Sequence, residues 1–258
     1  DPYGHFYALD VYTTDWADEH TFPRGSAAVL RLIEAIKKSG SDASTSPVVQ
    51  RRVLGEVSIE PDGSFYVRVP ANLTVELQLL DADGMALQDC GWIWVKNHSP
   101  QGCIGCHEDP ERTPINRVVD AVKKPPIFLD TPPEKRWSVG FVEDVWPKLG
   151  RDCLPCHEST SEPRLTRDAE QTYRRLLAGS SSDTRRPYVI PGKARSSPLV
   201  WHLLGRNTAR PWDGDADDHP VKPLPPDTTI PSDTIRTIVR WIDLGAQWTR
   251  STAPAFAE

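Results

Sequence analysis

Two short segments of the 258-residue chain combine residue types and spacing that suit iron porphyrin chemistry. Cys103-Ile104-Gly105-Cys106-His107 and Cys153-Leu154-Pro155-Cys156-His157 both have the pattern C-x-x-C-H. Two thiols about one helical turn apart can form thioethers to the two vinyl groups of haem, and the adjacent His places a ring nitrogen on the iron. The two motifs therefore predict two covalently bound haem c groups, with His107 and His157 as axial iron ligands.

Three other uses of these cysteines explain less of the pattern. A C-x-x-C redox pair is expected near a βαβ pattern, which the sequence lacks. A shared zinc site made of four thiolates needs no His after each pair, and disulfides between the pairs leave both histidines unexplained. The fifth cysteine, Cys90, is left unpaired.

The attachment chemistry also predicts a compartment, because haem is joined to thiols outside the bacterial cytoplasmic membrane. We therefore expect a periplasmic or extracellular protein. The chain begins at Asp1 with no apolar signal segment, which fits a mature chain after signal removal.

Composition excludes several classes of function. The formal net charge is −6 and no basic stripe occurs, so nucleic acid is not an expected partner. The longest apolar runs, Ala27–Leu30 and Trp92–Val95, are far shorter than the ~20 residues of a transmembrane helix. The 25 prolines predict loops and short elements.

The pattern predicts an α+β protein, with a small antiparallel β-sandwich-like module over residues 1–135 that carries the first haem. Strands are predicted at Phe6–Tyr12, Val53–Glu60, Ser64–Val69, Thr74–Asp81 and Trp92–Val95, with Asp62-Gly63 as a hairpin turn. Apolar residues at helical spacing predict an amphipathic helix over Ser26–Lys38, and their β-branched content leaves a strand as the alternative.

Residues 136–258 predict a loop-rich α-helical cytochrome c domain that carries the second haem. Its helices are expected at Val139–Leu149, Ala169–Ala178, Pro198–Leu204 and Ser232–Leu244. The last begins with Ser232 as its N-cap and ends before Gly245.

The C-terminal half resembles planctomycete-type cytochrome c domains. The similar pieces are the second C-x-x-C-H motif, Ile190-Pro191-Gly192, Ser197-Pro198-Leu199, Pro223-Leu224-Pro225-Pro226 and Trp241–Ala246. In that family a Met-Pro-Pro loop usually supplies the sixth iron ligand, but Leu224 takes the Met position here. We therefore expect His219 or His202 as the sixth ligand of the second haem.

The first haem has no single candidate for its sixth ligand. Met85, the only Met, and the unpaired Cys90 are candidates, although each suits the role of an apolar filler as well. His20 and His5 lie in an irregular segment that can fold back, whereas His98 is too close to Cys103 in sequence.

Residues 53–124 resemble the middle domain of the hydrazine synthase alpha subunit family, in LGEVSIEPDGSFYVRVPA, LQLLDADGMALQ, WIWV and CIGCHEDPERTPINRV. The resemblance implies a catalytic first haem whose iron is bound by a Tyr shortly after the motif, with the motif His freed for zinc, and a second, bis-His haem. Here Glu111 stands four residues after His107 and no Tyr occurs between Cys103 and Arg151. We therefore expect His107 to stay on iron.

Two functions follow. The favoured one is a dihaem cytochrome that passes electrons between partner redox proteins, such as other cytochrome subunits, within a larger complex. The alternative is a haem enzyme acting on small nitrogen or oxygen species at an open first haem, with Glu108, Asp109 or Glu111 as nearby acids.

Overall fold

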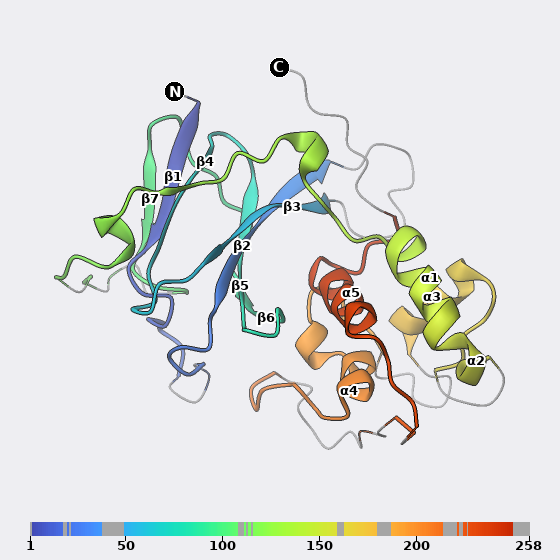
Figure 1. The fold of residues 1–258 in the computed structure, drawn as a ribbon. Helices are drawn as coiled ribbons and strands as arrows, with labels where there is room; N and C mark the ends of the chain where they lie inside the picture. The colour runs from blue at the N-terminus through green and yellow to red at the C-terminus, as the bar shows by residue number, and fades with distance from the viewer. Residues whose placement is uncertain are drawn as a thin grey trace. The chain divides into compact units, whose positions relative to one another are not determined.

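The computed structural model describes residues 2–17, 20, 22–37, 49–107, 111, 113–114, 116–158, 163–179, 187–213, 221, 224–225 and 227–249. The chain divides into two compact units, with the division between Trp137 and Ser138. The first unit holds two β-sheets and the second holds the helices (Figure 1). This is an α+β protein, as the sequence predicts.

The first unit is a two-layer β module. Its strands are β1 (Tyr3–Ala8), β2 (Val29–Lys37), β3 (Val49–Ser58), β4 (Phe65–Pro70), β5 (Val75–Leu80), β6 (Ala86–Asp89), β7 (Pro100–Cys103) and β8 (Ile127–Phe128). One sheet has the order β7-β1-β4-β8 and the other the order β3-β2-β5-β6. The second sheet is antiparallel, whereas β7 and β8 pair in parallel with β1 and β4, so the first sheet is mixed.

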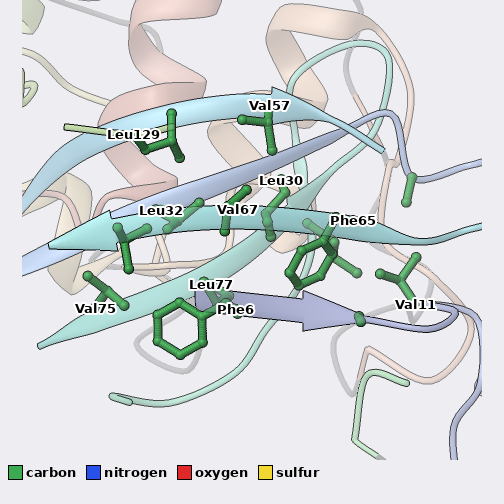
Figure 2. Close-up of a cluster of buried hydrophobic side chains, with 14 of the residues drawn as sticks. Phe6, Val11, Leu30, Leu32, Val57, Phe65, Val67, Val75, Leu77 and Leu129 are labelled. Carbon is green, nitrogen blue, oxygen red and sulfur yellow. The ribbon is translucent and has the colours of Figure 1, made fainter. Parts of the chain in front are cut away.

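The core of this module lies between the sheets. Figure 2 shows Phe6 of β1, Val67 of β4, Leu30 and Leu32 of β2 and Leu77 of β5 within one buried cluster. Side chains alternate between the two faces of a strand, so β1, β4 and β5 each contribute every second residue to this cluster. Cys90, Cys103 and Cys106 pack against its border.

The helix predicted over Ser26–Lys38 is wrong, and the strand alternative is correct. β2 runs from Val29 to Lys37 and pairs with β3 on one side and β5 on the other. Every residue from Leu30 to Glu34 is buried, so apolar side chains occur on both faces. A strand buried on both faces has no strict alternation, and its pattern then matches that of a helix.

Two further strand predictions need correction. The turn at Asp62-Gly63 forms, but β3 and β4 on its two sides belong to different sheets, so it joins the layers instead of closing a hairpin. No strand forms over Trp92–Val95, where only Ile93 bridges to Val75. The neighbouring position beside β5 is occupied by β6, which the sequence did not predict.

The second unit contains α1 (Trp146–Asp152), α2 (Leu154–His157), α3 (Ala169–Ala178), α4 (Pro198–Leu204) and α5 (Ser232–Asp243). The helix predicted from Val139 starts instead as a π-helical turn at Phe141–Val145 that continues into α1. Pro231, not Ser232, occupies the N-cap position of α5, without a side-chain capping bond. None of the helices built by the described residues combines the length and apolarity needed to cross a membrane.

The helices of this unit pack around aromatic side chains. The Phe141 ring lies 5.3 Å from that of Trp241 and 5.2 Å from that of Tyr173, between ring centroids, and it stacks on Trp248 at 5.7 Å. Trp241 is fully buried and donates its indole N–H to the Gln247 carbonyl. The turn before α1 is thereby fixed against α3 and α5.

Candidate haem sites

The first C-x-x-C-H segment continues the edge of the first sheet. Cys103 is the last residue of β7 and pairs with Ala8 of β1. The backbone N–H of Cys106 donates to the Thr13 carbonyl at 3.0 Å, and that of Asp15 donates to the His107 carbonyl at 3.1 Å. The motif is therefore not a helical turn here, because its backbone hydrogen bonds run to the chain that follows β1.

Gly105 allows this close approach. A Cβ at this position would lie 2.0 Å from the Thr13 carbonyl oxygen, well inside van der Waals contact. Any larger residue would push the motif away from residues 13–15. The glycine between the two cysteines thus has a steric role in the first motif that spacing alone did not predict.

His107 is held at one ring nitrogen. Its Nδ1 lies 2.8 Å from the Asp15 carboxylate, and the Trp16 ring packs beside it at 5.0 Å between centroids. The side chain remains 58% exposed, so the ring is accessible to a ligand. Histidines that bind metals commonly donate their other ring N–H to a carboxylate in this way. Asp15 and Trp16 were missed by the sequence, because no local pattern links positions 92 residues apart.

The second motif has the helical form that the sequence predicts. Cys153 precedes α2, and the His157 backbone N–H donates to the Cys153 carbonyl at 3.1 Å. The His157 Nδ1 lies 3.0 Å from the carbonyl oxygen of Pro163, which leaves Nε2 for a metal. Pro163 was also missed, since a backbone acceptor has no residue-type signal.

The helix before the second motif is tied to α5. The Thr234 hydroxyl donates to Asp152 at 2.7 Å, and Arg151 donates to both oxygens of the same carboxylate. The hydrogen bonds from Arg151 and Thr234 hold the pKa of Asp152 below its ordinary value. Burial raises the pKa of the neighbouring Cys153 thiol to about 11, and the charges of Asp152 and Cys156 add to this. The protonated thiol resists oxidation, which acts on thiolates.

Both motifs fit haem c in donor chemistry. Each supplies two thiols and a histidine with Nδ1 engaged, and the cysteines of the first motif pack against the apolar core of the β module. Within the described part of the chain, no three His, Cys, Asp or Glu side chains gather as a group able to hold a metal ion. Haem attachment and iron ligation remain predictions at Cys103, Cys106, His107, Cys153, Cys156 and His157.

The predicted sixth ligands lie at separate places. His202 is half-buried in α4, whereas His219 falls outside the described residues. Met85 is buried in the turn between β5 and β6, and His20 is exposed. Glu108 and Asp109 also fall outside the described residues.

Cys90 follows β6 near the first motif. Its sulfur accepts a hydrogen bond from the Leu77 backbone N–H at 3.4 Å. Burial raises the pKa of the Cys90 thiol to about 11, and the charge of Cys103 contributes to the rise. Cys90 is therefore a partly buried thiol whose sulfur already accepts a hydrogen bond from the backbone of β5.

The architecture defines a class: a two-layer β module with a C-x-x-C-H segment at its sheet edge, followed by a helical unit with a second such segment. Residues 22–108 match the family model of the hydrazine synthase alpha subunit middle domain. That match ends at the first motif. It agrees with the resemblance seen in the sequence, whereas the cytochrome c resemblance of the C-terminal half stays a prediction.

Two comparisons with hydrazine synthase of Kuenenia stuttgartiensis extend beyond the middle domain. The chain is 23% identical to hydrazine synthase subunit alpha over 291 aligned positions, which cover 85% of this chain and 35% of that protein. A solved structure of the hydrazine synthase superposes with a TM-score of 0.77 at 21% identity, over 99% of this chain and 44% of the other. The chain thus spans about a third of that subunit's length, and the structural likeness establishes a shared fold.

Proposed function

We propose that the protein is an extracytoplasmic dihaem c-type protein whose first haem is a reaction centre for small nitrogen or oxygen species, as in a hydrazine synthase-like enzyme. The observation that carries the proposal is the position of the His107 ring, which contacts Asp15 and Trp16 at the edge of the β module. This module contains the residues that match the alpha subunit family. The similarity to a hydrazine synthase subunit favours this enzyme over the electron carrier expected first from the sequence.

Each residue of the first site has a distinct task. Cys103 and Cys106 would form the two thioethers, and His107 would bind iron through Nε2. Asp15 would accept a hydrogen bond from the Nδ1–H of His107, which selects the tautomer and makes Nε2 a stronger donor to iron. The haem, when bound, supplies an iron centre that can change its oxidation state and bind small molecules.

The sixth position of the first haem is proposed to be open to a small ligand. The Cys90 sulfur is engaged by the Leu77 backbone N–H, and Met85 is buried in a turn of the second sheet. His20 is exposed on the segment that follows Trp16. Ligation by Met85, Cys90 or His20 would instead give a six-coordinate iron and an electron carrier. Spectroscopy distinguishes this alternative from an open sixth position.

The second haem is proposed to pass electrons to or from the first. His157 would bind its iron, with His202 or His219 as the sixth ligand. Partner redox proteins fit this role, since the similar Kuenenia stuttgartiensis protein is named a subunit. A purely electron-transferring protein is the second candidate function, favoured by Glu111 at the place of the Tyr and by the lack of Tyr between Cys103 and Arg151.

The test is a haem count followed by spectroscopy of the loaded protein. We expect two covalent haems per chain by the pyridine haemochromogen assay, one of them high-spin and able to bind carbon monoxide after reduction. The variants C103A/C106A and C153A/C156A each remove one haem, and only the first should abolish carbon monoxide binding. Two low-spin haems that ignore the gas would refute the enzyme and leave the carrier, whereas no covalent haem would refute both.

A further inference from the structure

A groove of about 400 Å³ lies beside β7 in the β module and has no part in the sites above. The segment between β6 and β7 and the first residues of β7 form its walls. The residues relevant here are Trp92, Trp94, Lys96, Ser99, Pro100 and Gln101. Its volume is in the range of small-molecule and cofactor sites, roughly 300–1,000 Å³.

The groove is close to the first motif along the strand. Gln101 lines the groove, and Cys103 follows two residues later on the same face of β7. At the rise of a strand, the Cα atoms of these two residues are about 7 Å apart. Gly102 between them faces the other side, where a Cβ would lie 2.2 Å from the Tyr7 ring. The Cys103 thiol is therefore on the face of β7 that also carries Gln101, one of the residues of the groove wall.

The lining suits a flat apolar molecule with acidic ends. Trp94 is 56% exposed, an unusually open position for an indole, and its neighbours on the groove wall include a second Trp. Arg51 packs over the Trp92 ring at 5.3 Å and thereby fixes that wall. Lys96 and Gln101 add a cation and an amide, which are groups that pair with carboxylates.

We propose that this groove receives the body of the haem attached at Cys103 and Cys106, with Trp92 and Trp94 against its apolar surface and Lys96 beside a propionate. The proposal rests on the proposed function, because it needs a haem at the first motif. It adds residues that would contact the haem at a distance from the two cysteines that anchor it. It also explains the exposure of Trp94, because a haem bound in the groove would cover this side chain.

The test compares surface labelling of the loaded protein with that of C103A/C106A, which retains only the second haem. Hydroxyl-radical footprinting read by mass spectrometry should modify Trp94 about fivefold more slowly in the loaded protein, since a seated ligand covers most of the surface it contacts. Phe128, half exposed on β8, is the internal control and should react equally in both. Trp94 reacting equally, with two haems counted in the loaded protein, overturns the proposal.

Unequal labelling of Phe128 would reveal that C103A/C106A misfolds. A second measurement then tests the proposal without this variant. In the loaded protein, W94F should change the Soret circular dichroism, because indole and haem transitions couple at short range. F128L is the matched control and should leave the band unchanged. An unchanged band in W94F then overturns the groove, whereas a haem count that lacks the first haem refutes the proposed function instead.

Discussion

Glu34 joins two buried arginines and thereby fastens the chain that leads out of the β module. Its Oε2 is 2.8 Å from Arg52 Nη2, and its Oε1 is 2.8 Å from Arg136 Nη1. All three side chains are less than a tenth exposed. Arg52 also donates to the Pro133 carbonyl and Arg136 to that of Thr131, so residues 131–136 are held against β2 and β3.

The substitution E34Q tests this network. It removes the only carboxylate that faces these two guanidinium groups in the interactions described. It leaves one acceptor oxygen at position 34 instead of two, beside the carbonyls of Pro133 and Thr131. Removing one partner of a buried ion pair costs roughly 3–5 kcal/mol, because the remaining charge is uncompensated. The amide keeps one hydrogen bond, so we expect about 3 kcal/mol of lost stability in the β module.

The assay must report on one unit, because the chain has two and their unfolding need not coincide. Amide hydrogen exchange by mass spectrometry, read on peptides from β2 and β3, gives the free energy of opening of the β module. E60Q is the matched control: Glu60 pairs with Lys124 at 2.8 Å, but the lysine is 61% exposed. Exposed pairs contribute about 0.5 kcal/mol.

Salt sharpens the comparison. Exposed pairs are screened at high ionic strength, whereas buried pairs are screened much less. In concentrated sodium chloride the E60Q effect should disappear and the E34Q effect should persist. If E34Q costs no more than E60Q in either condition, then Glu34 is not the fastening point, and the burial of these charges does not determine the stability of the module.

Three further predictions address the first site and the acid response. D15N should raise the reduction potential of the first haem, because a neutral amide at position 15 makes His107 a weaker electron donor to the iron. The expected change corresponds to a free energy on the order of 1 kcal/mol and is measured by redox titration. An unchanged potential would contradict this role of Asp15. G105A should lower the yield of the first haem by the pyridine haemochromogen assay, because its Cβ would meet backbone at 2.0 Å, whereas G150A, with nothing within 4 Å, should not. Burial acts to raise the pKa of Asp62, but hydrogen bonds from the Ser64 hydroxyl and backbone amides outweigh it and place the pKa below 3.8. This stabilisation is present above pH 3.8 and is lost as pH falls through the lower folded pKa of Asp62. In D62N the free energy of unfolding should therefore decrease less between neutral and acidic pH, as measured by urea unfolding.

The bounds of β4 and β5 follow from the sequence because their signals are local, whereas β3 starts four residues before the predicted range and ends two residues before its end. β4 and β5 start and end within one residue of the predicted ranges, and α3 and α4 match theirs. Alternation of apolar residues and helix-end signals depend only on near neighbours. The same property explains the error at β2, because its burial on both faces depends on contacts with residues outside a local window of sequence.

The seat of His107 could not be predicted for a related reason. It depends on the parallel pairing of β7 with β1, which no turn or spacing encodes. Once that pairing is made, the segment after β1 runs beside the motif, and Asp15 reaches the His107 ring. A four-residue, largely exposed edge strand such as β7 carries almost no apolar pattern of its own, so the decisive contact had no sequence signal.

The first site therefore belongs to a larger structural unit than the family match. Residues 22–108 contain Cys103, Cys106 and His107, but β1, Asp15 and Trp16 precede that range. β8 and the segment fastened by Glu34 follow it. A fragment cut to the matched range would lose the partner strand of β7 and the carboxylate on His107. The smallest piece expected to hold the first haem as described is accordingly residues 2–137.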